Sequence, residues 1–187
     1  MAPLPLLHAD QSLLLIVDMQ SGSAQTCAPA SWRATRDRAI ALARAAGSLG
    51  LPVIATRQQG LEGGDIDPEL ARALPPHAVC LDKTQFAAPA DEAIAQALAM
   101  AGREQVVVCG MAAHVAVVQT VSELVAASYR PFAITDAICA TDTSDTEAAR
   151  ARMRAAGTPL LSAESALCEW LRDAAHPLFQ QLLAERT

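Results

Sequence analysis

Asp18, Lys83 and Gly110 each lie at or just beyond the end of a short apolar run. A carboxylate there can accept or donate a proton, and a nearby ammonium stabilises negative charge beside it. Gly110 predicts a tight turn from a strand into a helix, whose first backbone N–H groups are suited to binding an anion. Taken singly, an Asp is commonly a turn residue and a Lys a solvated charge, so the prediction rests on the combination.

A parallel sheet is needed to bring these positions together. Apolar runs predict strands at residues 13–17, 53–55, 78–81, 106–109, 132–134 and 160–161, and helical patterns occupy residues 31–49, 91–101, 115–128, 144–156, 163–174 and 177–185. The strands are apolar on both faces, as in a sheet covered on two sides. We therefore expect a three-layer α/β/α sandwich of Rossmann-like type, with a mostly parallel six-stranded sheet, in a single domain over residues 1–187. The three candidate positions would then meet at the carboxyl edge of the sheet.

Turn and cap residues refine this plan. Ser144 with Glu147 three residues later predicts a capping box, and Gly102 and Gly157 predict helix ends. Pro177 suits the first turn of the last helix. The glycine-rich segment 60–64 predicts a mobile loop, and its glycines lack the strand-turn-helix setting of a phosphate cradle.

The composition favours a small organic ligand over a polymer or a membrane. A chain of 187 residues with 52% hydrophobic content can bury one sizeable core, and its net charge of -6 offers no basic stripe for nucleic acid or anionic lipid. The first apolar run is too short for a membrane span or a signal-peptide core, so we expect a cytoplasmic protein with neither nucleic-acid nor membrane partners. The cysteines are scattered without zinc spacing, which predicts reduced thiols: Cys27, Cys80, Cys109, Cys139 and Cys168.

Three motifs together resemble the isochorismatase-like cysteine hydrolases. They are residues 16–20 around Asp18, residues 81–86 around Lys83, and the strand-to-helix segment 106–120. The order and spacing of these motifs extend the resemblance over nearly the whole chain. The resemblance implies a site in which the residue matching Asp18 accepts a thiol proton, while the residue matching Lys83 favours the thiolate. That thiolate would attack the carbonyl of a small amide-like substrate.

The resemblance also assigns roles to the turn after the fourth strand. It implies a cis peptide bond between Met111 and Ala112, and oxyanion-binding N–H groups from Ala112 and Ala116. Ala113 belongs to the same turn. We expect His114 to contact the substrate or, as an equal alternative, to have a capping or interface role.

Phe86 is the best aromatic candidate for the pocket. Members similar to nicotinamidase carry an Asp-x-His metal element after the second strand, and residues 56–65 contain no His, so we expect neither a catalytic metal nor a cofactor. The carboxyl-terminal stretch around Trp170 is apolar, and members of the family that this chain resembles commonly associate. We therefore expect a symmetric homo-oligomer.

Ala116 occupies the position of the family's nucleophilic Cys, and a methyl group cannot attack a carbonyl. Three explanations stay open: an introduced Cys-to-Ala substitution, a natural loss of catalysis with the pocket kept for binding or assembly, or hydrolysis of a vinyl ether with Asp18 as general acid. The third ranks last, because the segment 111–120 resembles the cysteine-hydrolase branch more closely. Among the other thiols, only Cys139 is placed to reach the pocket, and a structural role suits it better.

Overall fold

The computed structural model describes residues 4–25, 27–60 and 63–184. Its centre is a six-stranded parallel sheet with the strand order β3-β2-β1-β4-β5-β6. The strands are β1 (Ser12–Val17), β2 (Val53–Gln58), β3 (Val79–Lys83), β4 (Gln105–Met111), β5 (Arg130–Cys139) and β6 (Leu160–Leu161). The predicted α/β sandwich is confirmed. Because the strand order reverses between β1 and β4, a ligand crevice is expected where these two strands end.

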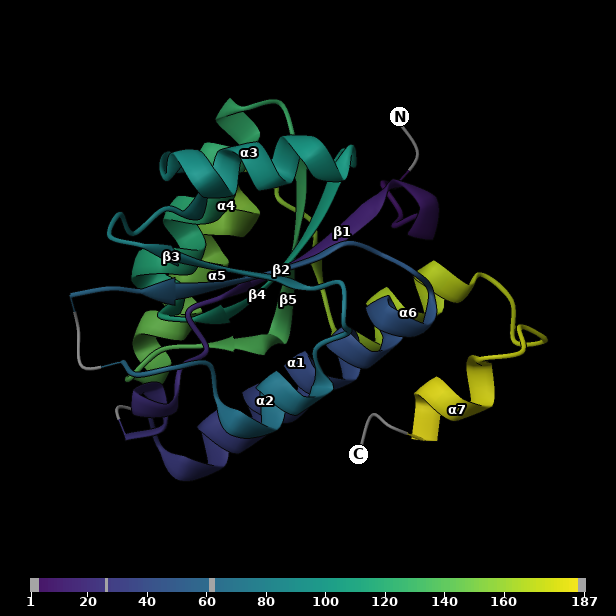
Figure 1. Ribbon diagram of the computed structural model, residues 1–187, viewed down its shortest axis with the longest axis horizontal. Helices are drawn as coiled ribbons and strands as arrows, with labels where there is room; N and C mark the ends of the chain where they lie inside the picture. Colours follow the sequence, from purple (N-terminus) through teal and green to yellow (C-terminus); the bar gives the residue numbers. More distant parts are fainter. Residues whose placement is uncertain (1–3, 26, 61–62, 185–187) are drawn as a thin grey trace.

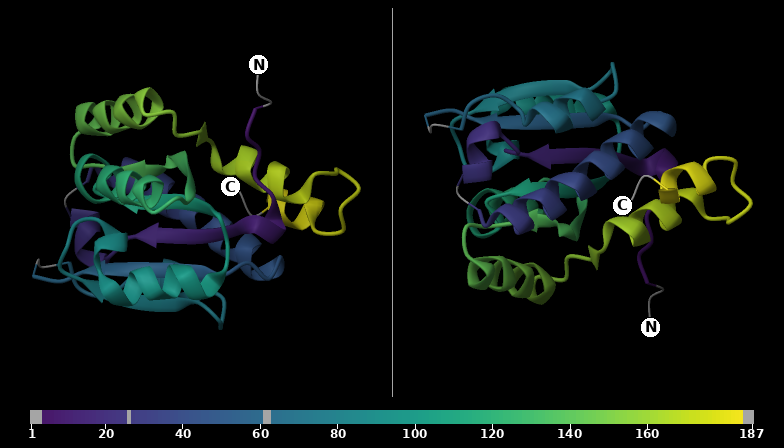
Figure 2. Two further views of the ribbon diagram at one scale, coloured as in Figure 1. Left: turned by 90° about the horizontal axis from the view of Figure 1, so that it is seen from above. Right: turned by 90° about the horizontal axis from the view of Figure 1, so that it is seen from below.

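Helices cover both faces of this sheet (Figure 1). They are α1 (Pro29–Ser48), α2 (Pro68–Ala73), α3 (Glu92–Ala101), α4 (Val118–Ala126), α5 (Thr143–Ala155), α6 (Ala163–Leu171) and α7 (Phe179–Ala184). One face carries α1 and α6, and the other carries α3, α4 and α5. The chain beyond α6 extends to one end of the molecule, where α7 lies (Figure 2). In the described parts of the chain, no helix is both long and apolar enough to cross a bilayer.

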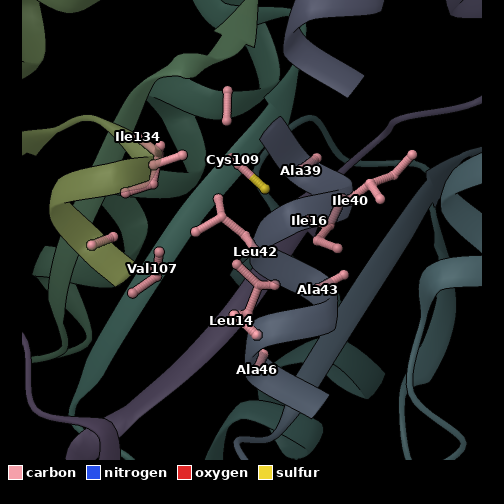
Figure 3. Close-up of a cluster of buried hydrophobic side chains, with 14 of the residues drawn as sticks. Leu14, Ile16, Ala39, Ile40, Leu42, Ala43, Ala46, Val107, Cys109 and Ile134 are labelled. Atoms are coloured by element: carbon pink, nitrogen blue, oxygen red, sulfur yellow. The ribbon is translucent and has the colours of Figure 1, made fainter. Parts of the chain in front are cut away.

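The two faces of β1 divide the core. Leu14 and Ile16 belong to the cluster beneath α1, whereas Leu13, Leu15 and Val17 belong to the cluster on the opposite face. Figure 3 shows the first cluster, in which β1 and β4 side chains meet one side of α1: Leu14, Ile16, Val107 and Cys109 against Ala39, Leu42, Ala43 and Ala46. Full burial of a leucine side chain contributes about 1.5–3 kcal/mol relative to exposure. This alternation anchors the sheet from which the site is built.

Helix caps agree with the sequence at one helix and disagree at another. Asp91 caps α3 by accepting from the backbone N–H of Ala93, and Gly102, at φ +61°, ends that helix as predicted. The predicted capping box at Ser144 is wrong, because α5 begins at Thr143 and the Glu147 side chain pairs with an arginine one turn later. The Glu147 carboxylate therefore forms a surface ion pair with Arg150 and does not accept the backbone N–H of a helix cap.

The carboxyl-terminal helices and one short helix also differ from expectation. The predicted helix 163–174 stops at Leu171, because Arg172 adopts a left-handed φ of +63°. The last helix begins at Phe179 rather than Pro177, and its predicted end at Glu185 lies outside the described residues. The short helix α2 was not predicted, although Asp67 caps it and Pro68 is its first residue.

Candidate active site

Asp18 leaves β1 in a strained turn at the carboxyl edge of the sheet. Its φ is +51°, a left-handed value that Asp tolerates better than most side chains. The neighbouring strand is close, since a Cβ on Gly110 would lie 2.0 Å from the carbonyl oxygen of Val17, and Gly110 itself has a φ of +132°. Glycine is therefore required where β4 passes the end of β1, which brings the β4 turn beside Asp18.

A buried ion pair fixes the Asp18 carboxylate. Lys83 Nζ donates to Asp18 Oδ2 at 2.6 Å, and Thr56 Oγ1 donates to Asp18 Oδ1 at 2.7 Å. The Lys83 side chain is 0% exposed, and its Nζ also lies 2.7 Å from Gln58 Oε1 and 3.2 Å from the backbone carbonyl oxygen of Phe86. Acceptors thus surround the ammonium, so its position relative to the carboxylate is fixed.

The electrostatic balance at Asp18 favours a proton-accepting group. Burial raises the pKa of the Asp18 carboxyl above its ordinary value, although the Lys83 ammonium and the Thr56 hydroxyl act in the opposite direction. A carboxyl with a raised pKa takes up a proton more readily than an exposed Asp. This property suits a general base beside a reacting thiol.

Gln20 and Gln58 form a second layer behind this pair. Gln20 Oε1 accepts from the Gln58 backbone N–H at 2.8 Å, and Gln20 Nε2 donates to the Gly64 carbonyl oxygen at 2.6 Å. Gln58 Nε2 donates to the Thr84 carbonyl oxygen at 2.8 Å while Gln58 Oε1 accepts from Lys83. Sequence reasoning missed both glutamines. The only signal was their position, two residues after Asp18 and at the end of β2.

Two glycines of the segment 60–64, Gly63 and Gly64, pack against the site. The Gly22 N–H donates to the Gly63 carbonyl oxygen at 2.8 Å, and a Cβ on Gly63 would lie 2.6 Å from Gln20 Nε2. Gly64 adopts a φ of +70° and packs equally closely on Ser21. Close packing against Gln20 and Ser21 therefore requires glycine at positions 63 and 64. The mobility of the loop stays a prediction. Residues 61–62 of that loop lie outside the described residues.

The turn after β4 is a π-helix over Ala113–Val117 that continues into α4. Ala112 precedes it, and the Ala112 carbonyl oxygen accepts from the N–H groups of Val115 at 3.0 Å and Ala116 at 2.9 Å. The Ala116 N–H is therefore occupied inside the turn and does not point freely at an oxyanion. The expected cis bond between Met111 and Ala112 is wrong, because every described peptide bond is trans, which is the favoured form of a non-proline bond by about 3 kcal/mol.

A pocket of about 480 Å³ opens between these parts. Its lining includes an apolar wall of Phe86, Met111, Ala112, Val115 and Ala116 and a polar wall of Asp18, Gln20, Ser23, Gln58, His114 and Thr141. Lys83 lies behind Asp18 and is not part of the lining. Ala113 is 0% exposed and belongs to the core, and Cys139 is buried against Cys27 instead of facing the pocket. The structure thus gathers Asp18, Phe86, Ala112, His114 and Ala116, and leaves Ala113 and Cys139 out.

His114 brings a second ionisable side chain to this pocket. Its Nε2 lies 3.7 Å from Asp145 Oδ2 on α5. Its Nδ1 is buried and has no hydrogen-bond partner among the described residues. An unpaired buried nitrogen is costly, so a ligand group or water that bonds to it would be favoured. Nowhere in the described residues are three His, Cys, Asp or Glu side chains grouped closely enough to hold a metal ion.

Comparisons with known proteins identify a family for this chain. The family model of the Isochorismatase domain matches residues 12–165. Isochorismatase domain-containing protein 2 of Danio rerio is 29% identical over 185 residues, covering 97% of this chain and 90% of that protein. The secreted isochorismatase effector Isc1 of Phytophthora sojae (strain P6497) is 30% identical over 141 residues, covering 74% of this chain and 67% of the effector.

Solved structures share the same arrangement of elements. YcaC from Pseudomonas aeruginosa, solved with hexane-2,5-diol and covalent acrylamide, superposes with a TM-score of 0.90 at 25% identity, covering 100% of this chain and 94% of that one. MAR1 ribonuclease from Caenorhabditis elegans superposes with a TM-score of 0.89 at 24% identity, covering 97% and 92% of the two chains. The sheet order, the Asp18 and Lys83 motifs and the matched domain all lead to one assignment: this chain belongs to the isochorismatase family.

Proposed function

We propose that this chain binds a small amide-like molecule in the pocket beside Asp18, and that covalent thiol hydrolysis is absent because Ala116 stands where the family's nucleophile would be. One observation carries the proposal. The Asp18 carboxylate, held by Lys83 at 2.6 Å, lines a pocket whose lining also includes the methyl group of Ala116. The groups that would activate a thiol are in place, while the sulfur atom is not.

Another cysteine does not supply that sulfur. None of the residues that line the described pocket is a cysteine. Cys109 and Cys139 are buried, and burial raises the pKa of both thiols, which disfavours the nucleophilic thiolate. The pocket therefore offers its ligand hydrogen bonds and apolar contact in place of a covalent bond.

Two observations support an amide as the ligand. The Asp18 oxygens accept hydrogen bonds, and an uncharged amide N–H can donate to them without adding charge to the buried ion pair. YcaC from Pseudomonas aeruginosa, which shares this fold, was solved with covalent acrylamide, a small amide. The genomic codon at position 116 separates an introduced substitution from a natural loss of the cysteine.

Hydrolysis of a vinyl ether with Asp18 as general acid is the second candidate. The raised pKa of Asp18 favours it, because a general acid must carry its proton near neutral pH. The Lys83 ammonium at 2.6 Å opposes it, because a neighbouring positive charge favours the ionised carboxylate. Turnover of a vinyl-ether substrate that is lost in Asp18→Asn would decide for this candidate over simple binding.

We extend the proposal to the state of the molecule in the cell: one cytoplasmic domain that assembles as a homo-oligomer. An Escherichia coli relative in fold, the YcaC gene product, is described as an octameric hydrolase of unknown specificity. Exposed apolar side chains are available for assembly on this chain, including Val79 at 43%, Val125 at 52% and Met100 at 81% exposure. Sedimentation velocity of the purified chain measures this, and a monomer at all concentrations would contradict it.

Restoring the missing atom tests the proposed site. Ala116→Cys puts a thiol in the pocket that Asp18 lines, with the Lys83 ammonium 2.6 Å behind that carboxylate. The positive charge is expected to lower the thiol pKa and raise the thiolate fraction. The new thiol should react with iodoacetamide faster than the five native cysteines and faster than the control Ser122→Cys on the exposed side of α4. Adding Lys83→Met should slow the reaction. Equal rates at positions 116 and 122 would refute a dormant thiol site.

Binding is tested on the unaltered chain. Acetamide, isobutyramide and benzamide are titrated and the melting temperature is followed, since a ligand of the native state raises it. The double variant Asp18→Asn/Lys83→Met keeps the side-chain shapes without either charge. A stabilisation by amides that this variant lacks supports the proposal, and the absence of any effect in the unaltered chain contradicts it.

A further inference from the structure

Cys27 and Cys139 form a pair of free thiols behind the pocket. Cys27 lies in the segment that joins the 3-10 helix Ser21–Gln25 to α1, and Cys139 is the last residue of β5. Their Sγ atoms are 3.6 Å apart, although 112 positions separate them in the sequence. Both are nearly inaccessible, at 6% and 4% exposure. The pair therefore brings two distant segments of the chain together at one point of the core.

These two segments also form part of the pocket wall. Cys27 Sγ donates to the Ala140 carbonyl oxygen at 3.1 Å and lies 3.9 Å from Met111 Sδ. Met111 and Thr141, the residue after Ala140, both line the pocket. Residues 22 and 23, shortly before Cys27, line it as well. The thiol pair thus contacts the pocket lining at Met111 and lies two residues from it at Thr141.

We propose that Cys27 and Cys139 are an oxidation site, at which a peroxide converts the two thiols to an intramolecular disulfide. One thiolate attacks the peroxide, forming a sulfenic acid and releasing water, and the second thiol displaces hydroxide as a second water while the S–S bond forms. The two sulfurs lose two electrons and two protons in total, and one peroxide is reduced to two waters. The sulfur atoms must approach by about 1.5 Å to reach bonding distance.

The disulfide is expected to alter the pocket through a hydrogen bond. In the reduced protein the Cys27 S–H is a donor to the Ala140 carbonyl oxygen. Oxidation removes that hydrogen, and a buried carbonyl oxygen without a donor is unfavourable. The peptide group of Ala140 must then find another partner, which moves Thr141 in the pocket wall. The cross-link also restricts the segment that carries Ser23.

Burial of the two thiols makes this oxidation slow, and Cys109, which is also buried, serves as an internal control. Burial raises the pKa of Cys27 to about 12, so that its reactive thiolate is rare near neutral pH. Cys109, in β4, is fully buried and also has a pKa raised to about 12. Its Sγ has no thiol within contact among the described residues. Cys109 is therefore a matched single thiol, which is expected to stay reduced while the pair oxidises.

The experiment treats the native full chain with hydrogen peroxide or with the dithiol oxidant diamide. Remaining thiols are then alkylated in denaturant, and non-reducing peptide mapping by mass spectrometry identifies the cross-links. We expect the Cys27–Cys139 peptide pair to become the main intramolecular product and Cys109 to be recovered alkylated. The melting temperature of the oxidised protein should rise by roughly 5–15 °C and return after dithiothreitol. Hydrogen exchange should change in residues 21–28 and 139–142.

Two variants keep the test decisive. Cys27→Ser and Cys139→Ser are each expected to abolish the cross-link and the rise in melting temperature, whereas Cys109→Ser leaves both unchanged. Cross-links that involve only the exposed Cys80 and Cys168 would overturn the proposal. So would a Cys27–Cys139 bond that forms only in denaturant, because the native arrangement would then not direct it. A disulfide that forms without any change in hydrogen exchange at residues 139–142 would overturn the link to the pocket.

Discussion

Removing the Lys83 ammonium perturbs the best-defined electrostatic feature of this protein. In Lys83→Met the Asp18 Oδ2 atom loses a donor at 2.6 Å, and Gln58 Oε1 loses one at 2.7 Å. The Lys83 side chain is 0% exposed and that of Asp18 is 9% exposed, so water cannot easily replace the missing donor. Methionine preserves the apolar stem. The variant therefore isolates the cost of an unpaired buried carboxylate.

Breaking a buried ion pair from one side typically costs about 3–5 kcal/mol. For a chain of this size each kcal/mol lowers the melting temperature by about 2–4 °C, which predicts a fall of roughly 6–20 °C. The free energy of unfolding is measured by urea denaturation at pH 7, followed by circular dichroism. The double variant Asp18→Asn/Lys83→Met should recover a large part of the loss, because no charge then remains buried without a partner.

The matched control is Arg57→Met. Arg57 pairs with two carboxylates, where Lys83 pairs with one: it lies 2.6 Å from Asp82 and 2.8 Å from Asp65, but its side chain is 29% exposed and the Asp65 side chain 79%. Exposed pairs contribute about 0–1 kcal/mol. If Lys83→Met costs no more than Arg57→Met, or if Asp18→Asn fails to relieve it, the buried charge pair is not the dominant interaction at this edge of the sheet.

Gly110→Ala is expected to lower the free energy of unfolding by about 2–5 kcal/mol in urea denaturation, because the new Cβ would meet the Val17 carbonyl oxygen at 2.0 Å and the backbone of β4 has a φ of +132° at this residue. Asp91→Ala should cost about 1 kcal/mol in the same assay, since two N–H groups of α3 lose their cap. The raised pKa of Asp18 predicts a pH effect: its stabilising contribution is complete below the ordinary pKa of 3.8 and is lost as pH rises through the folded-state pKa. Unfolding free energies of the unaltered chain minus those of Asp18→Asn/Lys83→Met, measured from pH 3 to 8, should fall over that range, and a flat difference would contradict the direction of the shift.

The fold was readable from the sequence because parallel strands buried on two faces leave a simple pattern. The runs 13–17 and 106–109 correspond to the adjacent strands β1 and β4. The close approach of Gly110 to Val17 was not predicted, because Gly110 was interpreted as a strand-to-helix turn and it lies inside β4 instead. The extent of β5 was not readable. Its pairing with β4 shifts between Val108 and Gly110, so the strand continues past the polar residues Thr135 and Asp136. Such an irregularity is decided by neighbouring strands and not by local periodicity.

The site was only partly readable for a related reason. Asp18 and Lys83 stand at strand ends and belong to recognisable motifs, so their residue types alone were informative. Gln20 and Gln58 act by holding other groups, through contacts between segments 38 positions apart. Nothing in the local sequence distinguishes a glutamine that supports a buried ammonium from one that is solvated. The proximity of Cys27 and Cys139 likewise arises only from the tertiary structure and could not be predicted from the local sequence.

The buried pair of Asp18 and Lys83 helps to decide whether the pocket still binds a ligand with Ala116 in place of a cysteine. A buried ion pair usually contributes little net stability compared with well-packed apolar residues, because both charges lose their hydration. Here the Lys83 ammonium is further surrounded by Gln58 and backbone carbonyl oxygens, and the Asp18 backbone adopts a left-handed conformation. A buried charge pair and a left-handed Asp both lower the stability of the fold compared with apolar residues at the same positions. A requirement for stability alone therefore does not explain them. They are better accounted for by a carboxylate that must face a ligand, and this supports binding in the pocket even where the attacking sulfur is missing.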